Sequence, residues 1–423
     1  MKNYYEEILD YVNTLQIIDS HEHLPGYERN RERDTDILKE YLSQYFSSDL
    51  VSAGLKFSEL EFARDEKQPL AERWKVVEPY WNLARNTGYG RALDLSVKAL
   101  YGADRIDGET IEGLNREFLK TLEPGQNHYR KVLKEMSKIQ YSVLDGDLDC
   151  DRTYFRSTCH LSVFINPNTW DQIEWVEKES GIPITSFDDW LEACEILIGR
   201  ALQMGAVALK CTLAYNRPLF FENTGRREAE ECFNRMIPKK GRPGWEPGWA
   251  DVTKPFQDYM MHYILRIANR RGLICQFHTG LQEGNRNYIY NSDPSLLSNL
   301  FVQYQNVKFD LFHIGYPYQH VMSALGKMFP NVYLDMCWAH IISPAACIHT
   351  LEEWLDSAPV NKIIAFGGDY CLVDGVYAHQ LLARRNVSKT LAQKVEDSVF
   401  GVDEAKWMAK RMFYENPREL YGE

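Results

Sequence analysis

Short apolar runs separated by amphipathic stretches recur along most of the chain. An alternation of this kind predicts a parallel sheet with crossover helices. The first run, residues 16–20 (QIIDS), ends directly at His21. Seven later runs have the length of a buried strand, and they cover residues 140–144, 159–165, 206–213, 273–278, 307–313, 332–337 and 363–367. Eight such strands predict an α/β fold of the (β/α)8 TIM-barrel type.

One long segment interrupts this alternation. Residues 34–138 carry apolar side chains at intervals of three and four, as in DTDILKEYLSQYF, which is typical of amphipathic helices. The segment is too long for an ordinary connection between a strand and the next helix. It is predicted to be a helical insertion after the first strand, within a single domain that covers residues 1–423. A second long connection, residues 215–253, is expected to form a lid or rim.

Five acidic or imidazole side chains stand where predicted strands end. His21 and His23 follow the first strand, His278 and His313 end the fifth and sixth, and Asp369 follows the eighth. Each of them alone also fits a structural role, such as a hydrogen-bonded core histidine or a helix-capping aspartate. Active sites of such barrels lie at the carboxyl ends of the strands. We therefore expect the five side chains to converge there on a divalent metal.

Composition narrows the classes of function. The formal net charge of -12 argues against nucleic acid as a partner, because phosphate contacts need clustered Lys and Arg. No run has the apolar length that crosses a membrane. The nine cysteines form no C-x-x-C pair, and the amino terminus lacks the features of a signal peptide. We expect a cytoplasmic protein with a small-molecule substrate. The sequence is compatible with either a monomer or a homo-oligomer.

The sequences around the strand ends resemble the amidohydrolase superfamily, in the amidohydrolase-2 branch that includes decarboxylases, lactonases and uronate isomerases. The runs QFHTGLQEGN, FHIGYPYQH and FPNVYLDM, and the K-x-T-x-A-Y-N-R pattern that starts at Lys210, are similar to the amidohydrolase domain that is fused to glutamine synthetase-like proteins in some organisms. The resemblance covers about residues 15–24 and 139–421. The helical insertion is similar to that of uronate isomerases.

The resemblance implies roles for the strand-end residues. His21, His23, His278 and Asp369 would bind a divalent metal, with zinc first and manganese or iron as alternatives. Asp369 would also accept and return a proton as a catalytic residue. His313 would be catalytic by orienting the substrate or the attacking water.

Lys210, at the fourth-strand position, admits three interpretations. As an ammonium beside a single metal ion, the preferred interpretation, it would bind an anionic group of the substrate. As a carboxylated lysine it would bridge two ions, and His313 would bind the second. It could also be a surface or ion-paired lysine. Arg217, just past this strand, either clamps a substrate carboxylate or is simply exposed.

Three functions follow from this site. The first is hydrolysis of a small, anionic, carbonyl-containing substrate (an amide, a lactone or an ester) by water that a metal activates. The second is a non-hydrolytic decarboxylase or a uronate-type isomerase on the same metal. The third is a metal-stabilised barrel that binds a partner without turnover, and the complete set of strand-end ligands argues against it.

Overall fold

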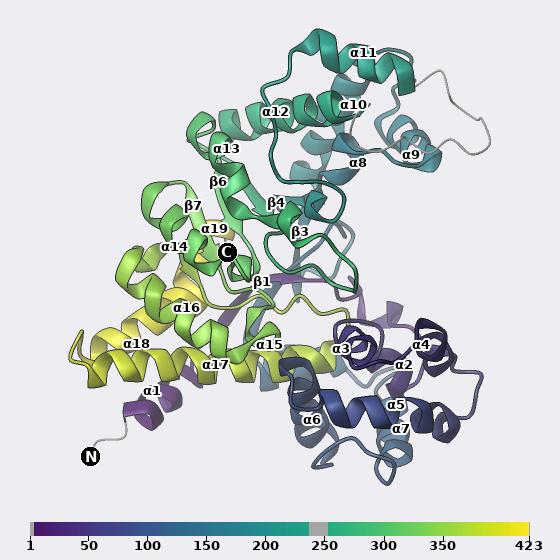
Figure 1. Cartoon of the computed structure of the whole chain (residues 1–423), viewed down its shortest axis with the longest axis vertical. Coiled ribbons are helices and arrows are strands. Elements are labelled where there is room, and N and C mark those ends of the chain that lie inside the picture. Colours follow the sequence, from purple (N-terminus) through teal and green to yellow (C-terminus); the bar gives the residue numbers. More distant parts are fainter. Residues whose placement is uncertain (1–3, 237–252, 423) are drawn as a thin grey trace.

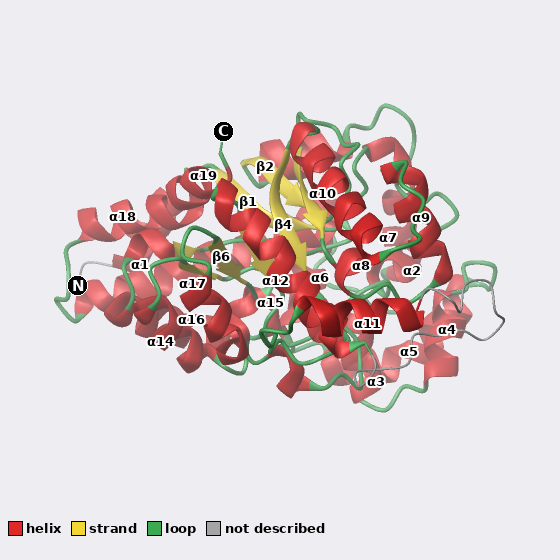
Figure 2. Ribbon diagram, turned by 90° about the horizontal axis from the view of Figure 1, so that it is seen from above, coloured by secondary structure: helices red, strands yellow, loops and turns green. Residues whose placement is uncertain are grey.

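The computed structural model describes residues 4–236 and 253–422, and eight parallel strands form a barrel within them. Neighbouring strands pair in chain order, from the first to the eighth. The strands are β1 (Ile17–Glu22), β2 (Ile139–Leu144), β3 (Phe155–His160), β4 (Ala206–Cys211), β5 (Ile274–Phe277), β6 (Lys308–Leu311), β7 (Val332–Asp335) and β8 (Ile363–Ile364). Helices surround the strands (Figures 1 and 2), so the predicted α/β barrel is confirmed.

Outside the insertion, helices surround the barrel (Figure 2). They are α1 (Tyr4–Val12), α8 (Ser162–Ile165), α9 (Trp170–Ser180), α10 (Phe187–Gln203), α11 (Arg226–Met236), α12 (Lys254–Arg271), α13 (Ser298–Gln303), α14 (Gln319–Met328), α15 (Ala339–Ile342), α16 (Pro344–Ser357), α17 (Val373–Glu396), α18 (Val402–Lys410) and α19 (Asn416–Tyr421). Among the described residues, no helix is both long and apolar enough to cross a membrane. Of the connection predicted to form a lid, residues 237–252 lie outside the described residues.

The segment between β1 and β2 is helical, as predicted for residues 34–138. Its helices are α2 (Ile37–Tyr41), α3 (Phe46–Ser52), α4 (Phe57–Arg64), α5 (Leu70–Ala84), α6 (Gly88–Tyr101) and α7 (Ile111–Lys120), followed by a π-helical turn, Arg130–Met136. Local signals set their ends. The Thr87 side chain caps α6 by accepting a hydrogen bond from Gly90 N, and Gly102 ends that helix in the left-handed region, at φ 74°.

A buried carboxylate anchors the insertion to the barrel. Asp374, at the start of α17, accepts hydrogen bonds from the hydroxyls of Tyr41 (2.8 Å) and Tyr101 (2.6 Å) and contacts His128 Nε2 (2.7 Å). Burial alone would raise the pKa of Asp374, but the hydrogen bond and charge of His128 hold it below its ordinary value. Because Asp374 follows Asp369 closely in the chain, the anchor places the insertion beside the strand-end residues.

The third strand lies earlier in the chain than predicted. The sequence predicted residues 159–165, whereas β3 ends at His160 and residues 162–165 form α8. The apolar run LSVFI misled the prediction, because its residues are buried as a helical turn: Phe164 and Ile165 are both covered. The strand itself, FRSTCH, is rich in small polar side chains. As a consequence, His160 lies at the carboxyl end of a strand.

The barrel closes between β1 and β8 through the residues at the strand ends. Asp369 N donates a hydrogen bond to His21 O at 2.7 Å. The Asp19 carboxylate accepts another from Gly368 N at 2.9 Å. Since β8 itself has only two residues, these bonds fix the ends of the first and last strands side by side.

Candidate metal centre

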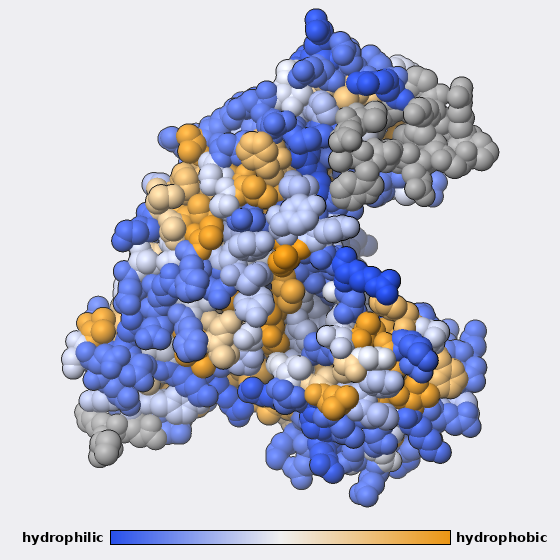
Figure 3. All heavy atoms as spheres, viewed as in Figure 1, coloured by the Kyte–Doolittle hydropathy of each residue, from blue (hydrophilic) through white to orange (hydrophobic). Residues whose placement is uncertain are grey.

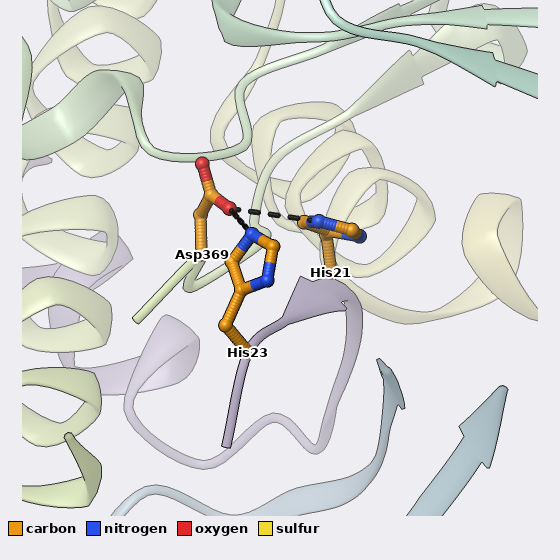
Figure 4. A group of neighbouring side chains, drawn as sticks. All are labelled: His21, His23 and Asp369. Carbon is orange, nitrogen blue, oxygen red and sulfur yellow. Dashed lines mark ion pairs between the residues drawn. The ribbon is translucent and has the colours of Figure 1, made fainter. Parts of the chain in front are cut away.

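Three predicted ligands meet at the carboxyl ends of β1 and β8 (Figure 4). We call His21, His23 and Asp369 the first cluster. The Nε2 atoms of His21 and His23 lie 3.5 Å and 3.0 Å from Asp369 Oδ1. One donor atom of each residue lies within 4.8 Å of the other two. Two imidazoles and a carboxylate at this spacing fit one zinc, manganese or iron ion and leave positions for further ligands.

The charge states of the first cluster also fit a metal ion. Burial and the Lys210 ammonium hold the pKa of His21 well below its ordinary value, so this imidazole is neutral. Burial alone would raise the pKa of Asp369, but the hydrogen bond from His23 and the charge of His313 hold it well below its usual range. Burial likewise opposes protonation of His23, but the hydrogen bond to Asp369 raises its pKa. A metal ion would therefore replace the proton on His23.

The backbone at the strand ends is held in an uncommon conformation. Asp369 and His313 have φ values of 59° and 67°, in the left-handed region. Such a residue costs about 1 kcal/mol or more and persists where its surroundings hold it. Gln44 Nε2 donates a hydrogen bond to Asp369 O at 3.1 Å, and the Tyr45 hydroxyl donates to the same oxygen. The helical insertion thus positions the carboxylate of the first cluster.

His278 and His313 lie beside the first cluster and contact each other. The Nδ1 atom of His278 is 3.0 Å from Nε2 of His313, which in turn lies 3.8 Å from Asp369 Oδ2. Burial, followed by the charge of His313, holds the pKa of His278 well below its ordinary value, and burial lowers that of His313 to about 4. The structure therefore brings His313 to Asp369 and places His278 against His313. That His278 binds the same ion as the first cluster stays a prediction.

Lys210 occupies the centre of the site. Its Nζ lies 3.1 Å from Nε2 of His21 and 4.0 Å from the centroid of the Phe312 ring. With 2% of its surface exposed, Lys210 is no surface lysine. An ammonium that binds an anion and a carboxylated lysine both fit this position, so its role stays a prediction.

Arg217 is buried and fully engaged with protein groups. Its guanidinium donates to Asp258 Oδ1 at 2.6 Å, to Gln257 Oε1 at 2.9 Å and to Phe220 O at 2.8 Å. It does not appear among the described residues that line the pocket over the first cluster. These contacts are those of a residue that fixes the loop after β4 to α12. Its role in substrate binding stays a prediction.

A cavity of about 520 Å³ lies over the first cluster. Strand ends and the helical insertion both contribute to its walls. The lining residues are His23, Ser43, Gln44, Tyr45, Asp145, His160, Lys210, Thr212, Tyr215, Asn216, His278, Glu283, Asp369 and Cys371. Figure 3 shows the molecule hollowed between the insertion and the part that contains α9 to α12.

Sequence reasoning missed two polar residues of this cavity. His160 Nε2 lies 3.1 Å from Thr212 Oγ1 and 3.8 Å from Asp145 Oδ2. Asp145 Oδ2 also lies 3.9 Å from His23 Nδ1. Burial lowers the pKa of His160. Asp145 directly follows the predicted strand 140–144, so the rule that selects strand-end residues could have found it.

Three comparisons agree with this architecture. Residues 239–422 match the family model described as amidohydrolase. Protein fluG of Emericella nidulans is 25% identical over 224 residues, 51% of this chain and 25% of that protein. A uronate isomerase of Shouchella clausii is 22% identical over 294 residues, 65% of this chain and 60% of that protein. The match thus spans less than two thirds of either relative.

A solved structure shares the whole fold. A uronate isomerase from Thermotoga maritima superposes with a TM-score of 0.81 at 16% identity and covers 100% of this chain and 98% of that one. The matched family model, the eight-stranded barrel and the cluster of candidate metal ligands at its strand ends are consistent with one another. Residues 239–422 therefore match the amidohydrolase family, and the whole chain has the fold of that uronate isomerase.

Proposed function

We propose that the chain is a metal-dependent hydrolase that acts on a small, anionic substrate with an amide, lactone or ester carbonyl. The observation that carries the proposal is the position of Asp369, which belongs to the first cluster and also lines the cavity above it. His21, His23 and Asp369 would hold the ion, which would supply Lewis acidity and lower the pKa of a bound water to about 7. Zinc is the first choice for this ion, with manganese and iron as alternatives.

The side chains around the cavity have separate tasks. Asp369 is ionised, so it accepts a proton from the attacking water and later returns it to the leaving group. His313 donates its Nδ1 hydrogen to Cys337 O at 3.0 Å, which turns Nε2 towards His278 Nδ1 and Asp369, so it would orient the attacking water or the substrate beside Asp369. Among the described residues that line the cavity, Lys210 is the one lysine or arginine, so it pairs with the anionic group of the substrate.

A second candidate function is isomerisation of a uronate. The uronate isomerases of the comparisons favour it, because one of them shares the fold over the whole chain. The cavity wall favours it too, since hydroxyl, amide and carboxyl side chains suit a polyhydroxylated acid; they are Ser43, Gln44, Thr212, Asn216 and Glu283. A decarboxylase on the same metal is the remaining alternative.

Product mass separates these reactions. Metal-loaded protein would be incubated with panels of lactones, amides, uronates and aromatic carboxylates, followed by mass spectrometry. A product that gains one water supports hydrolysis. An unchanged mass selects isomerisation instead, and loss of carbon dioxide selects decarboxylation.

A variant tests the role of Asp369 within the same assay. Asp369→Asn removes the proton acceptor, and kcat should fall by about 100-fold or more. Asp104→Asn, at an exposed aspartate paired with Lys98, is the matched control. Full activity of Asp369→Asn in a folded protein contradicts the assignment.

A further inference from the structure

Glu283 brings a carboxylate to the cavity without a protein partner. The residue lies on the connection after β5, is half-buried, and lines the cavity together with Lys210 and Asp369. Among the residues that the structure describes, no side chain forms a hydrogen bond or an ion pair with the Glu283 carboxylate. Its oxygens are therefore available to a molecule that enters the cavity.

The other two carboxylates of the cavity are engaged. Asp369 belongs to the first cluster. Asp145 accepts a hydrogen bond from the Thr158 hydroxyl at 3.4 Å and lies beside His23. Glu283 is thus the carboxylate of this wall that the described protein groups leave unused.

Hydrogen bonds fix the backbone that carries Glu283. Glu283 N donates to the Tyr215 hydroxyl at 2.9 Å, and Asn287 Nδ2 donates to Glu283 O at 2.7 Å. Asn285 Nδ2 ties the same connection to the insertion by donating to Ser48 O at 3.2 Å. A group on an anchored backbone loses less conformational freedom when it binds a ligand. This support is typical of a binding residue.

The positive charge of Arg64 compensates Glu283 only in part. Burial raises the pKa of Glu283, and the charge of Arg64 opposes this rise without cancelling it. The Arg64 guanidinium donates instead to Leu42 O at 2.9 Å and to Ser47 Oγ at 3.0 Å, within the insertion. A half-buried carboxylate in this state gains from a cation within hydrogen-bond distance.

We propose that Glu283 selects substrates that carry a primary ammonium group. This inference rests on the proposed function and narrows its substrate class to small zwitterions, such as amino acids with an amide, lactone or ester carbonyl. The anionic group pairs with Lys210, the ammonium group donates to Glu283, and the carbonyl faces the first cluster. An ammonium group is favoured over a hydroxyl, because hydrogen bonds between two charged groups are about twice as strong as neutral ones.

Two series of amides test the charge at a single position. Glutaramic acid, 2-hydroxyglutaramic acid and glutamine differ only at the carbon next to the carboxylate, which carries hydrogen, hydroxyl or ammonium. Succinamic acid, malamic acid and asparagine form the same series on a shorter chain. Metal-loaded full-length protein would be assayed for kcat/KM, and calorimetry would give Kd. The ammonium member should be favoured by about 10- to 100-fold over its two analogues.

Variants assign this preference to Glu283. Glu283→Gln keeps the size of the side chain and removes its charge, so the preference for the ammonium member should disappear. Glu283→Asp keeps the charge and should retain part of the preference. Glu117→Gln, at an exposed glutamate paired with Lys120, is the matched control and should behave as the wild type.

The outcomes distinguish this proposal from the proposed function. Hydrolysis of an analogue without preference for ammonium overturns the role of Glu283 and leaves the hydrolase standing. A preference for the hydroxyl members overturns the zwitterionic class, because Glu283 would then bind a neutral donor. A preference that survives in Glu283→Gln overturns the assignment to this residue. Folded, metal-loaded protein that binds none of these amides overturns the zwitterionic class, and the wider panel of lactones, amides and uronates decides the reaction separately.

Discussion

Gln44 holds both sides of the turn that carries Asp369. Its side-chain amide donates to Asp369 O at 3.1 Å, and its side-chain oxygen accepts a hydrogen bond from Cys371 N at 2.8 Å. Gln44 lies in the helical insertion, far from this turn in the chain. The insertion is therefore part of the support of the metal centre as well as a wall of the cavity.

Replacing Gln44 with Met should loosen this turn while keeping the length of the side chain. Replacing a hydrogen-bond partner of a metal ligand typically lowers metal affinity or activity by about 10- to 100-fold. We expect a loss of metal affinity and of kcat in this range. Metal titration and kcat would measure it. Gln68→Met is the control, because Gln68 bonds Asp65 on the insertion. Equal loss in both variants would mean that the insertion is generally destabilised.

Removal of the metal should abolish turnover and lower stability. A chelator should inactivate the protein, and added zinc or manganese should restore activity. An ion present at about 100 times its Kd adds about 2.7 kcal/mol of stability, so thermal unfolding should shift on chelation. Metal-free protein with full activity would contradict the metal-dependent mechanism.

Replacing Asp374 with Asn should destabilise the protein by about 3 kcal/mol, because the buried carboxylate holds three groups of the insertion. The pKa of Asp374 in the folded protein is below its ordinary value of 3.8. Its stabilising contribution is therefore present above pH 3.8 and is lost as the pH falls through the folded value. Urea unfolding of both proteins over a pH series measures this.

Tyr101→Phe is the control for that experiment. It removes one hydrogen bond to Asp374 and should cost about 1 kcal/mol. A gap between wild type and Asp374→Asn that stays constant down to the lowest pH would mean that the ionised carboxylate contributes nothing.

Replacing Arg217 with Gln should reduce stability and leave KM unchanged. The change leaves Asp258 buried with less compensation, and loss of one partner of a buried pair costs about 3–5 kcal/mol. Lys254→Met, at the more exposed second partner of Asp258, should cost less. A raised KM with full stability would instead support the substrate clamp. Unfolding curves and steady-state kinetics of the same preparations decide between them.

Replacing His160 with Asn should impair substrate binding without loss of metal. His160 lines the cavity but is outside the first cluster. Loss of one hydrogen bond to the substrate, about 1.4 kcal/mol, corresponds to about a tenfold rise in KM. Thr212→Val, which removes its hydroxyl partner, should act in the same direction. Unchanged kinetics in both variants would place this pair outside the substrate site.

The strand-end rule recovered the first cluster because barrel geometry brings the ends of distant strands together, whatever lies between them. The rule missed residues whose position in the site depends on contacts with distant parts of the chain. The polar strand β3 was hidden beside the more apolar α8, so His160 was missed. The role of Gln44 comes from its hydrogen bonds to the segment that follows the last strand. The burial of Arg217 comes from its ion pair with Asp258 in α12. Local sequence patterns do not predict such contacts between residues that are far apart in the chain.

The contact between the ends of β1 and β8 couples the metal centre to the separation of the first and last strands. His21 and Asp369 join through their main chains as well as through the first cluster. An ion bound by the first cluster would hold the ends of the first and last strands together. The amide protons of β1 and of the segment after β8 should then exchange with deuterium faster when the ion is released. Local opening of the barrel and loss of the ion would be coupled.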